Sequence, residues 1–155
     1  MPDTLSPSQR SYCMSRVKGK DTTPELLVRS ALHGRGLRFR KHAKELPGKP
    51  DVVFPSSRLA VFIDGDFWHG YRFPLWRDDL SPFWQEKIGK TRERDQRNFR
   101  KLRRSGWRVI RVWEHDIERR PTAVVDRIAT AVRQAAQTAT SPFHLSPTRD
   151  TLKLD

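Results

Sequence analysis

Acidic side chains and a histidine stand where the most apolar stretch of the chain ends. The segment VFIDGDFWHG, residues 61–70, begins as an apolar run and then carries Asp64, Asp66 and His69. Asp51 begins the apolar stretch before it. Carboxylates that converge on one side of a sheet suit Mg²⁺, which prefers oxygen ligands, and a histidine can give or take a proton near neutral pH. These residue types are compatible with metal-dependent hydrolysis of a phosphodiester bond.

Each of these residues also has an ordinary structural explanation. An aspartate at a strand end is most often a turn or capping residue, and a histidine among aromatic residues is often a hydrogen-bonded packing residue. Glu25 lies in the first turn of a predicted helix, where a carboxylate interacts favourably with the helix dipole. From residue types alone, the catalytic and structural interpretations of the cluster are about equally supported.

The net charge indicates a polyanionic partner. Lys and Arg outnumber Asp and Glu by 31 to 18, giving a formal charge of +13, which favours nucleic acid over the weaker alternative of an anionic membrane surface. No apolar run approaches the roughly 20 residues that a membrane span requires, and the N-terminus lacks the apolar segment of a secretory signal. We therefore expect a soluble, cytoplasmic protein associated with the nucleoid and not with a membrane.

The apolar periodicity and the turn residues predict an α/β sandwich with a central mixed β-sheet flanked by helices. Helices are expected over 21–36, 81–106 and 120–136, and strands over 37–42, 51–54, 58–64 and 107–114. Thr23 is the predicted N-cap of the first helix. The continuous apolar run at 58–64 predicts a central strand that is buried on both faces.

The composition divides the chain into three parts. Residues 1–20 are polar and basic, and we expect an arm or short helix that orders on a partner; the family resemblance given below implies that this partner is DNA. Residues 21–137 are expected to form the folded domain. Residues 138–155 are rich in Ser, Thr and Pro, which predicts a disordered tail.

Large aromatic residues gather between the strand at 58–64 and the long basic helix. Phe67, Trp68 and Trp84 are able to stack on bases or insert between base steps, whereas packing beneath a long loop is the alternative for each ring. Strand alternation would place the side chains of Phe67 and Trp68 on opposite faces. Lys87 and Arg94 accompany the rings on the basic helix, a combination suited to gripping phosphates while unstacking bases.

Five segments along residues 11–114 resemble the very-short-patch repair (Vsr) endonucleases, a branch of the PD-(D/E)xK nuclease superfamily. The segments are SYCMSRVKGKDTTPE, GLRFRKHAKELPGKPDVVF, FWHG, FWQEKIGKTRERDQRN and GWRVIRVWE. The resemblance implies a restriction-endonuclease-like fold and a strand-specific DNA endonuclease that nicks 5′ of the thymine at T:G mismatches. It also implies Mg²⁺ as the cofactor, with Mn²⁺ as a substitute, double-stranded mismatched DNA as the substrate, a MutL-type repair protein as a partner, and action as a monomer.

The same resemblance assigns roles by position. Asp51 matches the metal-binding aspartate, and the backbone carbonyl of Ile63 matches its partner ligand. His69 matches the catalytic histidine, and Glu25 matches the acid of the first helix that positions water on the metal ion. The aromatic residues that intercalate beside the mismatch correspond to Phe67, Trp68 and Trp84.

The sequence departs from the family where well-studied members bind a structural zinc ion. The four matching positions hold Asp66, Tyr71, Phe73 and His115. An aspartate and one histidine cannot replace a tetrahedral set of three cysteines and a histidine. We therefore expect no structural zinc, and a loop supported by the aromatic packing of Tyr71, Phe73 and Trp76. Asp66 has no assigned role at this point.

A second departure is Asp64, where the compared members carry a histidine beside the metal. The added carboxylate is expected to strengthen the binding of Mg²⁺ or Mn²⁺ and to take part in catalysis. His69 would then be the only imidazole available for proton transfer. Two alternatives stay open: a nuclease with the same chemistry but no mismatch specificity, in defence or general DNA processing, and a DNA-binding relative that has lost catalysis.

Overall fold

The computed structural model describes residues 6–9, 11 and 21–140, the last three of these by their backbone alone. The arm expected over residues 1–20 therefore falls almost wholly outside the described residues. Helix α5 (Pro121–Thr140) continues through Thr140, into the start of the expected tail. The rest of that tail lies outside the described residues.

Four strands form one mixed sheet in the order β1-β2-β3-β4. Strands β1 (Arg40–Lys41), β2 (Val52–Phe54) and β3 (Leu59–Asp64) pair antiparallel, and β4 (Arg108–Trp113) lies parallel to β3. The prediction of an α/β fold with a central mixed sheet is confirmed. All residues of β3 are buried, as expected for an inner strand that is covered on both faces.

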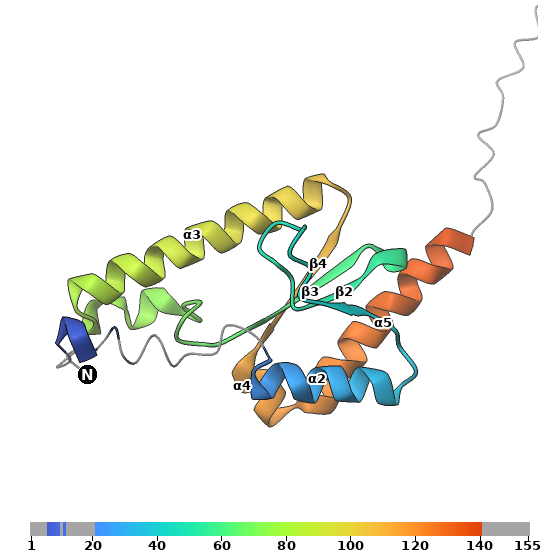
Figure 1. Ribbon diagram of the computed structural model, residues 1–155, viewed down its shortest axis with the longest axis horizontal. Coiled ribbons are helices and arrows are strands. Elements are labelled where there is room, and N and C mark those ends of the chain that lie inside the picture. The colour runs from blue at the N-terminus through green and yellow to red at the C-terminus, as the bar shows by residue number, and fades with distance from the viewer. Residues whose placement is uncertain (1–5, 10, 12–20, 141–155) are drawn as a thin grey trace, which may run out of the picture.

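Helices cover both faces of this sheet, as Figure 1 shows. Helix α3 (Pro82–Arg104) lies on one side, and α2 (Thr23–Gly34), α4 (Glu114–Arg119) and α5 lie on the other. The N-terminal half of α3 extends past the sheet. No helix in the described part of the chain is long and apolar enough to cross a membrane.

Strand alternation divides the core into two layers. On the face that meets α2, α4 and α5, Val61 and Ile63 of β3 join Leu32, Ile117 and other buried apolar side chains. On the α3 face, Phe62 packs edge to face against Phe99 of α3, with ring centroids 4.8 Å apart. Burying each such large side chain contributes about 1.5–3 kcal/mol, so both helical layers are anchored on β3.

Three local features differ from the sequence-based expectations. The N-cap of α2 is Thr22 and not Thr23, because the Thr22 side chain accepts a hydrogen bond from the Glu25 N–H at 3.4 Å. Strand β1 is shorter than predicted, since His42 takes a left-handed φ of 52° and ends the pleat. Helix α4 was not predicted, because Ile117 is its one buried residue and leaves no apolar stripe to recognise.

Candidate active site

Asp51, just before the start of β2, is hydrogen-bonded to Ile63, near the end of β3. The main chain of Asp51 donates to the Val61 oxygen at 3.0 Å, and its side-chain Oδ2 accepts from the Ile63 N–H at 2.7 Å. Because β2 has no residue left to pair with Ile63, the carboxylate takes the place of the next strand partner for that N–H. The structure thus brings the two positions together as the sequence analysis expected.

A pocket of about 770 Å³ opens beside this junction, between the start of α2, the end of β3 and the middle of α3. It contains most of the candidate residues. Those that line it are Glu25, Asp51, Ile63, Asp64, Trp68, His69 and Arg94. Phe67, Trp84 and Lys87 are not among its lining residues.

Burial and neighbouring acids perturb the Asp51 carboxyl. Desolvation is the largest cause of a pKa raised to about 7, and the charges of Glu25 and Asp64 raise the pKa further, against the hydrogen bond from Ile63. Such crowding of carboxylates is relieved by a cation. An oxygen-rich set of this kind fits a hard divalent ion such as Mg²⁺.

His69 lies between two aspartates. Its Nδ1 is 2.7 Å from Asp95 Oδ2, and its Nε2 is 3.4 Å from Asp64 Oδ1. Since a carboxylate can only accept hydrogen bonds, Asp95 places the ring proton on Nδ1 and leaves Nε2 as the nitrogen that exchanges protons. His69 lines the pocket, where an imidazole can transfer a proton near neutral pH.

Arg111 completes this network from the neighbouring strand. Its Nη2 lies 2.8 Å from Asp95 Oδ2, and its Nε lies 2.8 Å from Asp64 Oδ2. The second contact is an ion pair without good hydrogen-bond geometry, because neither atom has a hydrogen-bond partner in the described structure. Burial raises the pKa of the Asp64 carboxyl, and the charges of His69 and Arg111 oppose that effect.

Strand and helix periodicity explain why these side chains meet. Asp64 follows Phe62 on the α3 face of β3, and Arg111 lies on the same face of β4, opposite Phe62 in the parallel register. Asp95 lies on the buried side of α3, where it shares a stripe with the buried Ile88 and Leu102. The buried position of an acid on this stripe brings it against the end of the sheet.

The turn after β3 holds His69 in place through a glycine. Gly70 has a φ of +67°, a conformation that side-chain-bearing residues rarely adopt. A Cβ added there would lie 2.7 Å from Arg92 Cδ and 2.9 Å from Ile88 Cγ2. The main chain next to His69 can therefore approach α3 closely only with glycine at position 70.

Two groups of three described side chains offer metal-ligand atoms within 4.8 Å of one another. They are Asp64, His69 and Asp95, and Asp21, Glu25 and His42. An arginine already contacts each group: Arg111 the first and Arg29 the second. Asp51 belongs to neither group, and no arginine of the described structure is among the neighbours that shift the pKa of its carboxyl.

The aromatic residues pack on one another and not on opposite faces. The chain leaves the strand at Asp64, and a turn over residues 66–72 replaces the alternation that the sequence suggested. The Phe67 and Trp68 rings meet edge to face at 5.2 Å, and both contact Trp84, at 5.5 and 5.6 Å. Trp84 is 8% exposed and Phe67 39% exposed, so Trp84 supports the cluster while Phe67 presents it to solvent.

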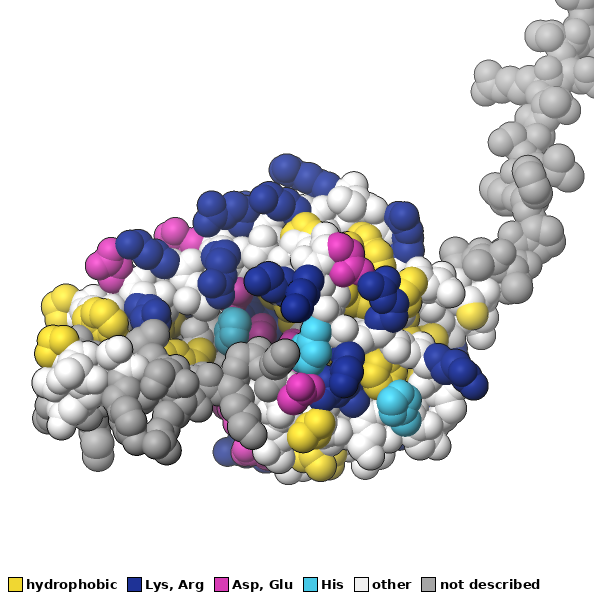
Figure 2. All heavy atoms as spheres, viewed as in Figure 1, with side chains coloured by type: hydrophobic (Ala, Val, Ile, Leu, Met, Phe, Trp, Pro, Cys, Tyr) yellow, Lys and Arg dark blue, Asp and Glu magenta, His cyan; other side chains and the backbone are white. Residues whose placement is uncertain are grey.

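Basic side chains surround the pocket. Lys87 and Arg94 lie two helical turns apart on one side of α3, and Arg94 is exposed at the pocket rim. Figure 2 shows Lys and Arg side chains gathered along α3 and around a hollow beside which acidic and histidine side chains are visible. A positive rim around an acidic centre suits a phosphate backbone that must approach carboxylates.

Three of the four residues at the family's zinc positions contact one another directly. His115 Nδ1 lies 2.7 Å from Asp66 Oδ1, and the Tyr71 ring packs on His115 with centroids 4.4 Å apart. Phe73 packs on Trp76 edge to face at 5.3 Å. The Asp66–His115 contact joins the turn after β3 to α4, so Asp66, left unassigned from the sequence, fastens this loop.

Asp95 and Arg111 were missed by the sequence analysis. The sequence does contain a signal for Asp95: an acid on the apolar stripe of a mainly basic helix is expected to be buried against a polar partner. Arg111 is harder to find, because alternation in β4 places it on a face without showing what covers that face.

The chain is similar to known proteins along most of its length. The family model described as DNA mismatch endonuclease Vsr matches residues 2–74. A type II nicking enzyme of Xanthomonas oryzae pv. oryzae is 48% identical over 122 residues, covering 76% of this chain and 88% of that enzyme. This chain belongs to the Vsr endonuclease family.

Other relatives of this Vsr family member show similar coverage. The DNA mismatch endonuclease Vsr of Escherichia coli K12 is 40% identical over 116 residues, covering 74% of each chain. A type II nicking enzyme of Neisseria meningitidis serogroup C is 37% identical over 134 residues, covering 84% of this chain and 90% of the relative. The resemblance inferred from the five sequence segments is confirmed.

Proposed function

We propose that this Vsr endonuclease is a Mg²⁺-dependent, strand-specific enzyme that nicks DNA 5′ of the thymine at T:G mismatches and so starts very short patch repair. The observation that carries the proposal is the position of Asp51, hydrogen-bonded to the Ile63 N–H beside a pocket that also contains His69. Mn²⁺ is the expected substitute for Mg²⁺, and a MutL-type protein is the expected partner of the monomer.

The proposed chemistry divides among the pocket residues. Asp51, the Ile63 carbonyl and Asp64 would hold the divalent ion, which supplies charge stabilisation at the scissile phosphate and the leaving oxygen. His69 moves a proton at Nε2 while Asp95 keeps Nδ1 protonated. Glu25 orients water in the pocket.

DNA recognition is assigned to the surface that continues from the pocket along α3. Arg94 and Lys87 contact phosphates, and the aromatic cluster, in which Trp84 supports Phe67 and Trp68, inserts its exposed part into the base stack. Phe67 is the ring of the three with the most exposed position. Base stacking on aromatic rings contributes about 1–3 kcal/mol per base, enough to offset part of the cost of opening a weakened mismatch.

A second candidate function keeps the chemistry but lacks mismatch specificity. The observation in its favour is the burial of Trp84 beneath Phe67 and Trp68, which leaves less aromatic surface for insertion. The two functions are separated by cleaving a panel of matched and mismatched duplexes with Mg²⁺ and mapping each nick to the nucleotide. The first requires one nick 5′ of the thymine of T:G; equal cleavage of matched DNA supports the second.

That panel needs a control for contaminating nucleases, for which an Asp51→Asn protein purified in parallel is suitable. A third outcome is also informative. Intact binding of T:G duplexes without metal-dependent nicking would contradict both functions and identify a DNA-binding relative.

Replacing Asp64 with alanine is expected to reduce nicking about 100-fold at saturating Mg²⁺, in line with the loss of groups that orient a metal site. The variant removes the carboxylate that faces His69 Nε2 and leaves Arg111 Nε without its ion-pair partner. Single-turnover cleavage of a T:G duplex measures the effect. Asp126→Ala is the matched control, because it removes an aspartate from an exposed arginine pair far along the chain. Near-normal nicking by the Asp64 variant would contradict the role.

We also propose that the loop after β3 needs no structural zinc. Metal analysis of the purified protein is expected to find far less than one zinc per chain.

Asp66→Asn should lower the free energy of unfolding by about 1 kcal/mol, because it removes a partly exposed charged contact to His115. Asp79→Asn, at an exposed site, is the control. One tightly held zinc per chain would refute the proposal, and an Asp66 variant as stable as the control would contradict the stabilising role of the contact with His115.

A further inference from the structure

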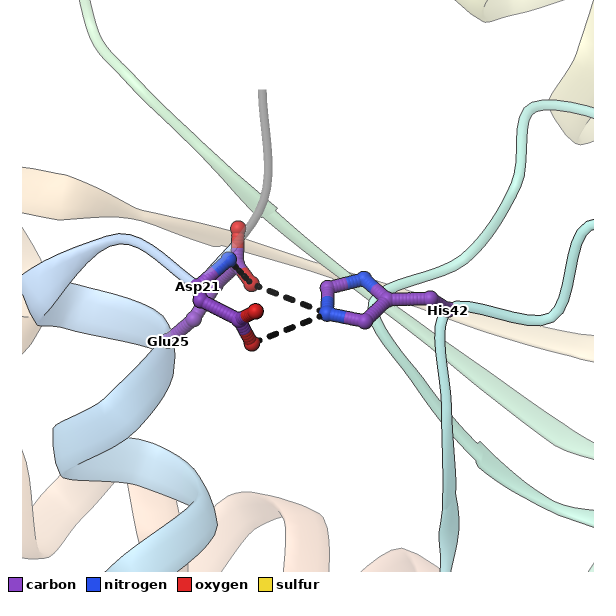
Figure 3. A group of neighbouring side chains, drawn as sticks. All are labelled: Asp21, Glu25 and His42. Atoms are coloured by element: carbon purple, nitrogen blue, oxygen red, sulfur yellow. Dashed lines mark hydrogen bonds and ion pairs between the residues drawn. The ribbon is translucent and has the colours of Figure 1, made fainter. Parts of the chain in front are cut away.

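A second polar cluster, formed by Asp21, Glu25 and His42, lies at the start of α2. Figure 3 shows Asp21 and Glu25 facing His42 across a short gap. Asp21 Oδ1 is 3.1 Å from His42 Nε2 and 2.6 Å from Arg29 Nη2, and Arg29 Nη1 is 3.2 Å from the same His42 nitrogen. Three parts of the chain meet here: Asp21, which precedes the N-cap of α2, Arg29 in the second turn of α2, and His42 directly after β1.

The cluster is an ion-pair network and not an empty cation site. The carboxylate and imidazole ligand atoms lie close enough for a metal ion, but the Arg29 guanidinium already lies within 4.0 Å of all three residues. Arg29 is buried, with 6% of its surface exposed. A buried guanidinium needs anionic partners, and hydrogen bonds from Arg29 and then His42 lower the pKa of the Asp21 carboxyl to about 2.

All contacts from this network to Glu25 fall on one of its oxygens. The Asp21 N–H donates to Glu25 Oε2 at 2.9 Å, and His42 Nε2 and Arg29 Nη1 lie 3.9 and 4.0 Å from that same oxygen. None of the three uses Oε1. Glu25 is 2% exposed and lines the pocket, so its carboxylate is held by one oxygen while the other stays outside these contacts.

The same network is tied to Asp51 through the main chain. The His42 N–H donates to the Asp51 carbonyl oxygen at 3.1 Å. Both Asp21 and His42 have a φ of 52°, a conformation that is unfavourable for a residue with a side chain and persists where surrounding contacts impose it. The side-chain contact between Asp21 and His42 thus joins the residue that holds Glu25 to the residue that holds Asp51.

We propose that Asp21, Arg29 and His42 are positioning residues that fix the Glu25 carboxylate relative to Asp51. The inference rests on the roles proposed above for Glu25 and Asp51. A simpler explanation is that the cluster only caps α2, as Thr22 does through its bond to the Glu25 N–H. A capping role predicts a loss of stability alone, whereas positioning predicts a loss of cleavage and of metal affinity.

The test uses Asp21→Asn, because asparagine keeps the size of the side chain and tolerates a positive φ. Compared with the full-length parent, its single-turnover rate on a T:G duplex is expected to fall about 10- to 100-fold, as is usual when partners that orient metal-site ligands are changed. Mn²⁺ affinity, measured by calorimetry without DNA, should fall as well. DNA affinity without a divalent ion should stay within about twofold, since this network is separate from the basic rim.

Arg29 supplies an independent variant. Arg29→Met should lose cleavage as Asp21→Asn does, and Arg29→Lys should recover part of it, because lysine keeps the charge but cannot bond Asp21 and His42 together. Arg40→Met is the matched control, since it removes an arginine–glutamate pair of 2.7 Å that is exposed and makes no contact with Glu25.

Glu25→Gln separates failure of the inference from failure of the proposed function. In the Glu25→Gln background, Asp21→Asn should cause no further loss of cleavage, because residues that act through one another are not additive. Unchanged cleavage by Glu25→Gln overturns the role of Glu25 and this inference with it. In the other outcome, Glu25→Gln loses cleavage strongly, but Asp21→Asn and Arg29→Met keep the cleavage and Mn²⁺ affinity of the control. That outcome overturns the inference alone, whatever the melting temperatures of these variants.

Discussion

Asp51→Asn is expected to abolish Mg²⁺-dependent nicking while making the metal-free protein more stable above pH 7. The cleavage rate should fall about 10³-fold or more, since metal ions contribute several kcal/mol of transition-state stabilisation and asparagine removes the proposed charged ligand. The amide keeps an oxygen that can accept from the Ile63 N–H, so the fold is retained. Single-turnover cleavage measures the loss of nicking, and duplex binding checks that the DNA-binding surface is retained.

The stability effect follows from the direction of the Asp51 pKa. Its value is raised from 3.8 to about 7 in the folded chain, so the folded state binds the proton more tightly than the unfolded state does. The stabilisation of the folded state by this proton is fully present below about pH 4 and is lost as the pH rises through 7. At about 1.4 kcal/mol per pH unit, the loss is a few kcal/mol.

Denaturant unfolding at pH 5 and pH 8 in chelator tests this. The parent should lose stability between the two values, and Asp51→Asn should lose much less. Mg²⁺ or Mn²⁺ at pH 8 should raise the melting temperature of the parent and not of the variant, because binding to the folded state stabilises it. Equal pH dependence in both proteins would contradict the crowded-carboxylate account. Asp79→Asn, at an exposed position, controls for loss of a charge.

His69→Ala is expected to reduce nicking by about 10²–10⁴-fold, the range for removal of a general acid or base. Binding of the T:G duplex should change little, because His69 contacts Asp64 and Asp95 and does not belong to the basic rim. Added imidazole should restore part of the activity by occupying the space between those carboxylates. Cleavage within tenfold of the parent would contradict a proton-transfer role.

A matched control and a partner variant sharpen that result. His33→Ala removes an exposed histidine whose ring stacks on Phe39 at 4.5 Å, and it should leave cleavage unchanged. Asp95→Asn should have a smaller effect than His69→Ala and should change the shape of the pH profile, since it alters which ring nitrogen carries the proton. An unchanged profile would remove Asp95 from the mechanism.

The fold was largely predictable because β3 and the long helix carry strong local signals. A continuous apolar run and a basic helix with an apolar stripe predicted the inner strand and α3, and the structure has both. The ends of elements were less accurate. Strand β1 stops where His42 takes a left-handed φ of 52°, and no local pattern in the sequence encodes that conformation.

The candidate site was predictable where a residue stands at a strand end, and not where two elements meet. Asp51 and His69 are visible in the sequence because their neighbours are apolar. The contacts of His69 with Asp95, and of Arg111 with both acids, depend on how α3 crosses the sheet. Phe67 and Trp68 were placed on opposite faces because the turn that begins after Asp64 has no clear local signature.

Helix α3 carries two parts of the molecule that would otherwise be independent. Trp84 supports the aromatic cluster near one end, and Asp95 holds His69 about three turns later. A helix is continuous and stiff over such a length. A substitution between residues 85 and 94 can therefore displace both the aromatic cluster proposed to recognise the substrate and the histidine proposed to take part in bond cleavage. Loss of nicking in such a variant therefore identifies neither step, and substrate binding and single-turnover cleavage have to be measured on the same protein before the defect is assigned.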